Sequence, residues 1–389
     1  MSDTTAKETN RRSILKAGAA GLATLASGST VAAANRSDKA SDVHAVKGTM
    51  NNPVSEKQRK QLRKRAVREY ERNTGETIEG IPACRPEAAH GSGDASEDSA
   101  SSEDNSNVVA YAYGIDADGT ARGYIGMAGE VKGVETNGRA EKGIHNRFED
   151  RVQEVSTKLE ASDDDLSTQS AGTITNLEDL EVAYDFPLEY EVRPYGRISS
   201  MNYWLEDTAN NDDRTLHGFH SPMTIEPGYQ VLDWDSHWHN ESAKKNHLWY
   251  KSDMDFVDVR DGHWEPSGPS DGGSTNTSYS VTASVSLTDI GVSGTVGWGY
   301  SEPAMERTDG SSQFDNYCSW FWDVTDRCGG SVRHSVLTME PLSMCEQTDY
   351  DCAMGRRDIC EVELKSTFTD GSCGDNHWLK SSSTAHLEC

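Results

Sequence analysis

The sequence predicts a mainly β protein, with an antiparallel β-sandwich as main domain, a small α/β (ββα) unit before it and a disulfide-rich C-terminal segment. Three observations predict this class. Short runs of alternating apolar and polar residues, separated by Asn, Asp, Gly and Pro turns, fill residues 173–317. Two strand-like runs and one amphipathic helical run fill residues 108–160. Seven of the eight cysteines fall in residues 318–389.

The first 34 residues have the pattern of an export signal. A charged stretch with Arg11 and Arg12 precedes a weakly apolar run over 17–26, and small residues at 32–34 provide a cleavage site after Ala34. Paired arginines followed by Ile14, Leu15 and Lys16 resemble a twin-arginine (Tat) signal peptide. The resemblance implies export of a folded protein, as is common for haloarchaeal secreted proteins. It therefore implies an extracellular location, with association at the cell surface as an option.

The charge of the chain is strongly acidic. Asp and Glu number 64 against 37 Lys and Arg, a net charge of -27, while 9 Trp and 14 Tyr argue for a folded core. Dense surface carboxylates on a folded protein suit molar salt, where self-repulsion is screened within roughly 3 Å. We expect a salt-adapted protein without a nucleic-acid partner. After the signal peptide there is no run of about 18 apolar residues, so we expect no transmembrane helix.

Residues 35–90 form a polar segment that contains one basic helix. Ser55 and Gln58 make a capping box, and Gly75 marks the stop. Lys and Arg dominate the stretch 56–72. Two interpretations stay open: a solvated surface helix, or a helix that docks on the acidic surface of the later domain, as a pro-segment would.

An acidic linker over 91–107 and a second linker over 161–172 bracket the ββα unit at 108–160. Strands are predicted at 108–115 and 121–127 around an Asp-Gly turn. The glycines in this unit do not form a dinucleotide-binding fingerprint, so they read as strand and turn glycines. One face of the following helix is apolar and consists of Ile144, Phe148, Val152, Val155 and Leu159.

The best-patterned part of the β-sandwich domain (173–317) is a hairpin at 279–300. Its alternation breaks at Thr288 and Asp289, where the apolar parity changes. We expect a framework hairpin; strands of this length and pattern also match the membrane-inserting hairpins of pore-forming proteins. The apolar positions are Tyr279, Val281, Ala283, Val285 and Leu287 in the first arm and Ile290, Val292, Val296, Trp298 and Tyr300 in the second.

The cysteines have no C-x-x-C spacing, which argues against a zinc ribbon or a thioredoxin-type motif. Outside the cell, disulfides are the default. Because the C-terminal segment holds an odd number, either Cys84 pairs across the chain or one thiol stays unbridged. The disulfide candidates are Cys84, Cys318, Cys328, Cys345, Cys352, Cys360, Cys373 and Cys389.

A candidate metal site lies at 233–239, with the sequence DWDSHWH. On a strand, Asp233, Asp235, His237 and His239 share one face, and carboxylate with imidazole suits zinc or a harder divalent metal ion. The four span about 20 Å, so they cannot all bind one ion. The alternative is a surface strand with its polar face in solvent and its tryptophans in the core. The metal candidates are His237, His239 and Asp235, joined by His217 and His220.

The functional class follows from what these patterns offer and lack. No G-x-S-x-G elbow or complete metalloenzyme signature occurs. Exposed tryptophans on a β-sandwich suit carbohydrate, so we expect a non-enzymatic binding or structural role at the cell surface, with envelope or polysaccharide as partner. Two alternatives stay open: a pore-forming or antimicrobial protein, since the layout resembles that of halocin precursors, and a secreted metal-dependent hydrolase.

Overall fold

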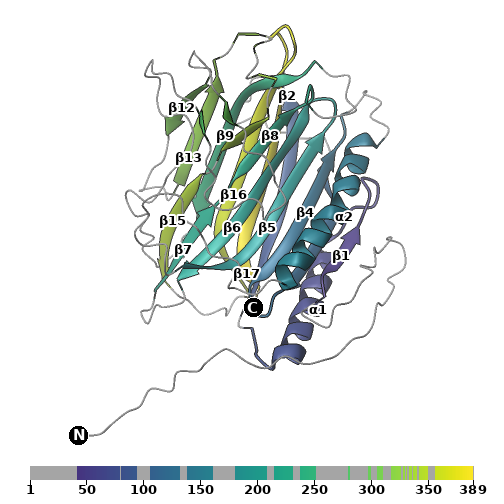
Figure 1. Cartoon of the computed structure of the whole chain (residues 1–389), viewed down its shortest axis with the longest axis vertical. Coiled ribbons are helices and arrows are strands. Elements are labelled where there is room, and N and C mark those ends of the chain that lie inside the picture. Colours follow the sequence, from purple (N-terminus) through teal and green to yellow (C-terminus); the bar gives the residue numbers. More distant parts are fainter. Residues whose placement is uncertain are drawn as a thin grey trace, which may run out of the picture.

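The fold is taken from a computed structural model, and Figure 1 shows two large β-sheets with two helices at one side. The prediction of a mainly β, mainly antiparallel protein is confirmed. The structure describes residues 42–78, 80–93, 106–131, 138–160, 180–207, 214–230, 237–250, 279–280, 297–298, 305–309, 317–325, 327–328, 330, 333–334, 336–339, 341–348 and 355–388.

The first sheet has nine strands, with the path β1-β3-β4-β5-β6-β7-β15, and β8 and β14 branch from β6. All its pairs are antiparallel except β4 with β5. A parallel pair needs a crossover, and the helix α2 (Arg139–Glu160) supplies it. The strands are β1 (His44–Lys47), β3 (Ser106–Ile115), β4 (Ala121–Gly129), β5 (Leu180–Val192), β6 (Gly196–Asp207), β7 (Arg214–His220), β8 (Met223–Pro227), β14 (Leu337–Met339) and β15 (Leu342–Thr348).

The second sheet has six antiparallel strands in the order β12-β13-β9-β16-β17-β2. Strands distant in sequence pair along their full length; β2, for example, pairs with β17 from Ile81 to Ser92. The strands are β2 (Ile81–Ser92), β9 (His239–Trp249), β12 (Met305–Asp309), β13 (Tyr317–Val324), β16 (Arg356–Thr369) and β17 (Asn376–Glu388). A separate two-stranded sheet joins β10 (Tyr279–Ser280) and β11 (Gly297–Trp298).

The helix α1 begins and ends as its sequence predicts, and α2 packs through its predicted apolar face. In α1 (Glu56–Thr74) the side chains of Ser55 and Gln58 form the capping box, and Gly75 closes the helix at φ 78°. In α2 the five residues of the predicted apolar face are at most 6% exposed. Gly126 allows the close approach of α2 to the sheet, because a Cβ there would lie 2.4 Å from Ile144.

The segment 108–160 is built into the main body. Its strands β3 and β4 belong to the nine-stranded sheet, and α2 lies along β4 (Figure 1). One apolar core runs from residues of α1 through both sheets to Ala385 in β17. No helix in the described part of the chain is both long and apolar enough to cross a bilayer.

Candidate functional site

The predicted metal motif is divided by the limits of the described residues. Asp233 and Asp235 lie outside them, whereas His237 precedes β9 and His239 begins it. The imidazole of His239 lies 4.1 Å from that of His334 between ring centroids, and Tyr229 stacks on His334 at 4.4 Å. Burial and the neighbouring His334 lower the pKa of His239 to about 4. This end of β9 therefore holds a His239 imidazole that is neutral at ordinary pH and lies against His334 and Tyr229.

The other metal candidates lie on β7 of the other sheet. His217 is 1% exposed, with Nδ1 3.2 Å from the Glu206 carboxylate and 3.2 Å from the Trp204 indole nitrogen. His220 stacks on Tyr203, and burial lowers its pKa to about 4. Among the described residues, no group of three His, Cys, Asp or Glu side chains could hold a metal ion.

The tryptophans with described side chains contribute to the core. Trp238 is partly buried, and the others are at most 9% exposed. Large aromatics in these positions stabilise the sandwich, and among the tryptophans with described side chains only Trp238 is accessible beyond 9%. The buried ones are Trp204, Trp249, Trp320, Trp322 and Trp378.

The cysteines form one described bridge, Cys328–Cys373, in the C-terminal segment. The bridge from Cys84 to that segment, one of the two alternatives, is absent from the described residues; the Cys84 sulfur lies 3.6 Å from the Tyr184 hydroxyl. Burial raises the pKa of this thiol, so it is a poor nucleophile. Cys318, Cys345 and Cys360 are fully buried on β13, β15 and β16. Cys352 and Cys389 lie outside the described residues.

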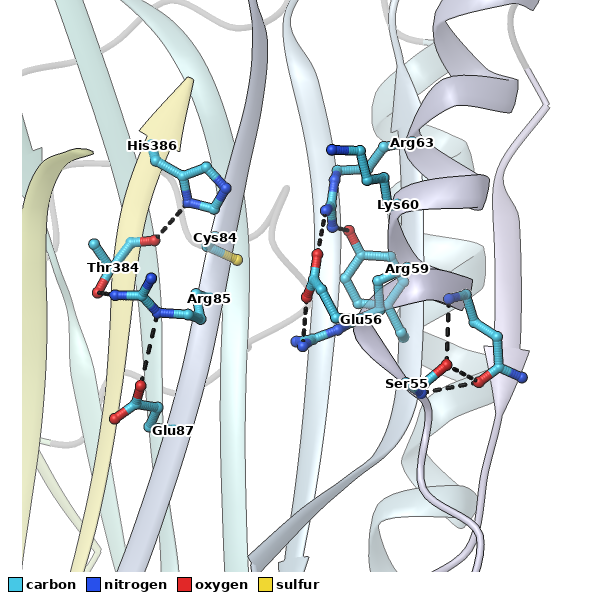
Figure 2. Close-up of polar contacts among 12 residues, drawn as sticks. Ser55, Glu56, Arg59, Lys60, Arg63, Cys84, Arg85, Glu87, Thr384 and His386 are labelled. Atoms are coloured by element: carbon cyan, nitrogen blue, oxygen red, sulfur yellow. Dashed lines mark hydrogen bonds and ion pairs between the residues drawn. The ribbon is translucent and has the colours of Figure 1, made fainter. Parts of the chain in front are cut away.

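The basic helix α1 docks on the body of the protein, so a purely solvated helix is wrong, while docking on an acidic surface of the later domain stays a prediction. Arg63 is 0% exposed and donates to Glu388 at 2.7 Å, Glu56 at 2.6 Å and the Tyr111 hydroxyl at 3.2 Å. Figure 2 shows Glu56 held between Arg59 and Arg63. These bonds join α1 to β3 and to the end of β17. A role for α1 in a removable pro-segment stays a prediction.

The hairpin predicted at 279–300 is described at its base only, at β10 and β11. There Tyr279 pairs with Trp298 and Ser280 with Gly297, antiparallel. In the described part of the chain, this pair shares no strand with either large sheet. The chain leaves the six-stranded sheet after β9 and joins the same sheet again at β12. Residues 279–300 therefore belong to the segment that connects these two strands.

Comparison with known proteins gives no family. No protein-family description and no curated protein sequence matches the chain. Among solved structures, one described as a pore forming protein aligns at 10% identity and TM-score 0.26, covering 53% of this chain and 86% of that one. Clostridium perfringens delta-toxin aligns at 9% identity and TM-score 0.25, covering 53% and 85%. At these TM-scores the similarity establishes neither a common fold nor a function.

Proposed function

We propose that this is an exported pore-forming protein whose 279–300 hairpin inserts into a lipid bilayer. The observation that carries the proposal is the register at the base of the hairpin, where Tyr279 pairs with Trp298. This pairing is symmetric about residues 288 and 289, the two residues at which the alternation in the sequence breaks.

If this register continues to residues 288 and 289, the side chains of the hairpin fall on two faces. Val281 would oppose Val296, and Val285 would oppose Val292, so apolar residues would meet apolar residues. The intervening positions are Ser, Thr and Gly in both arms, and they would form the other face. One lipid-compatible face and one small polar face is what a membrane-inserted hairpin around a water-filled pore requires.

The length and the composition of the two hairpin arms agree with insertion into a bilayer. Each arm has about nine residues, within the 9–11 that a tilted strand needs to cross a bilayer. Asp289, at the break, is the one charged residue between 279 and 300, in a chain that is 26% charged. Tyr279, Trp298 and Tyr300 all lie at the base, where an aromatic girdle would meet the membrane interface.

The two competing functions have less support. Surface binding through tryptophan faces would need exposed rings, and the described tryptophans are buried or partly buried. A metal-dependent hydrolase would need a ligand group, and none is present among the described residues.

The test is dye release from vesicles of zwitterionic or anionic phospholipid, with molar salt balanced on both sides. We expect the purified mature protein to release the dye and Val285→Asp to abolish release, since a charge on the lipid-facing side of a membrane-inserted strand destabilises it. The matched control is Ser284→Asp, one residue away on the polar face, which should retain most of the release.

Thermal unfolding of both variants checks that the body still folds. Failure of the wild-type protein to release dye from any of these vesicles, or equal loss in both variants, would overturn the proposal. Retention on polysaccharide without release would restore the binding alternative.

A further inference from the structure

A layer of polar side chains lies between the two sheets, at β9. Alternate residues of this strand point into the sandwich, and among them Lys245 is 1% and His247 0% exposed. Lys245 and His247 are called the β9 latch below. Basic side chains are almost never buried to this extent unless they are paired with a carboxylate.

Lys245 has a hydroxyl where a carboxylate is expected. Its ammonium donates to Ser200 of β6, in the opposite sheet, at 2.6 Å. No carboxylate contacts this ammonium among the described residues; Cys360 and Glu363 of β16 are the nearby titratable groups. Burial lowers the pKa of Lys245 from 10.5 to about 7. The amine is therefore about half neutral at pH 7 and mostly neutral at higher pH.

His247 has the same kind of environment. Its Nδ1 lies 2.7 Å from the Ser343 hydroxyl of β15, again in the opposite sheet. Its Nε2 is buried and has no hydrogen-bond partner in the described part of the structure. The ring meets Trp320 edge-on, and Cys318 of β13 pairs directly opposite. Burial, followed by Lys245 and His220, lowers the pKa of His247 well below 6.5.

The position of these two residues ties β9 to the opposite sheet. β9 lies between β13 and β16 in the six-stranded sheet, and Lys245 and His247 reach from it to β6 and β15. We propose that the β9 latch is an acid-sensitive lock between the sheets: charging Lys245 and His247 loosens β9 from the opposite sheet.

The sign of the effect follows from the direction of the shifts. An opened latch takes up protons at the ordinary pKa values, whereas the closed latch takes them up only at lower pH. Opening is therefore favoured as pH falls from about 10.5 to about 7 through Lys245, and again as pH falls below 6.5 through His247. Above these ranges both side chains are neutral in either state, and the latch is at its tightest.

The direct test is hydrogen exchange of the peptide that covers β9, corrected for intrinsic exchange rates, between pH 9 and pH 5. We expect its opening equilibrium to rise at least about tenfold from pH 9 to pH 7 and again from pH 7 to pH 5. In Lys245→Met the first rise should vanish, and in His247→Gln the second. Lys244→Met, on the outer face of the same strand, should keep both.

A flat exchange profile in the wild-type protein, or one that Lys245→Met leaves unchanged, would overturn the latch whatever the vesicle experiment gives.

Discussion

Two regions of the molecule bury charge in opposite ways. Beneath α2, the carboxylates of Glu189 and Glu191 on β5 are 2% and 0% exposed. Arg147 donates to both at 2.8 Å, and Arg151 adds a 3.0 Å bond to Glu189. Between the sheets, Lys245 is as deeply buried but bonds to a serine hydroxyl. Burial is equal in the two regions, and pairing is what differs.

Pairing reverses the effect of burial on the pKa. Burial opposes ionisation of Glu189, but Arg147 and Arg151 outweigh it and lower the pKa to about 2. Nothing outweighs burial at Lys245, so its amine loses its proton instead. Glu189 therefore keeps its charge over the ordinary pH range, whereas Lys245 in the β9 latch can change its charge within that range.

The largest effect is expected where a paired charge loses its partner. Glu189→Gln should destabilise the fold by about 3–5 kcal/mol, because an amide would replace the buried carboxylate that two partly buried guanidinium groups share. In the wild-type protein the carboxylate contribution is present above about pH 4.5 and is lost as the pH falls towards 2. Urea unfolding at fixed salt, repeated at several pH values, measures both.

The same series in Lys245→Met has the opposite sign. Removing an unpaired buried amine should raise the urea midpoint at pH 7, and the difference from wild type should shrink towards pH 10. A similar loss of stability in Glu189→Gln and Lys245→Met would show that the presence of an ion-pair partner does not distinguish the two regions.

An intermediate effect is expected at α1. Arg63→Met leaves the Glu388 carboxylate and the Tyr111 hydroxyl without their shared donor, so we expect a loss of about 2–4 kcal/mol. Lys60→Met is the matched control on the same helix: its side chain is 48% exposed and its amine lies 4.0 Å from Glu388, which predicts less than about 1 kcal/mol. Urea unfolding measures both losses. A similar loss in the two variants would mean that the charge of the helix, and not the burial of Arg63, determines the contribution to stability.

Local patterns were the predictable part of this fold. Ser55, Gln58 and Gly75 specify α1 because capping is satisfied within a few residues, and the apolar face from Ile144 to Leu159 specifies α2 because a helix repeats every 3.6 residues. The break at Thr288 and Asp289 likewise marks the centre of the register found at β10 and β11.

Long-range pairing was not predictable in the same way. Nothing near Lys245 in the sequence indicates that Ser200 will face it, because 45 residues and a change of sheet separate them. Alternation places Lys244 and Lys245 on opposite faces, but it does not say which face is inside. The DWDSHWH motif could not place its proposed partners for the same reason: His217 and His220 lie in the other sheet from His239.

The smallest effect is expected at an exposed ion pair on α2. It tests whether solvent exposure alone removes the contribution of an ion pair to stability. Glu149 of α2 bonds to Lys47 of β1 at 3.1 Å, with geometry as good as that beneath the helix, but the Glu149 side chain is 64% exposed. Water screens such a pair, so Glu149→Gln should change the free energy of unfolding by less than about 1 kcal/mol. A loss close to that of Glu189→Gln would show that the density of ion pairs around α2 sets the stability there. A negligible loss would show that burial is the property that makes the ion pairs of Glu189 stabilising. Burial would then also explain why Lys245, which has no carboxylate partner among the described residues, can act as a pH-sensitive switch.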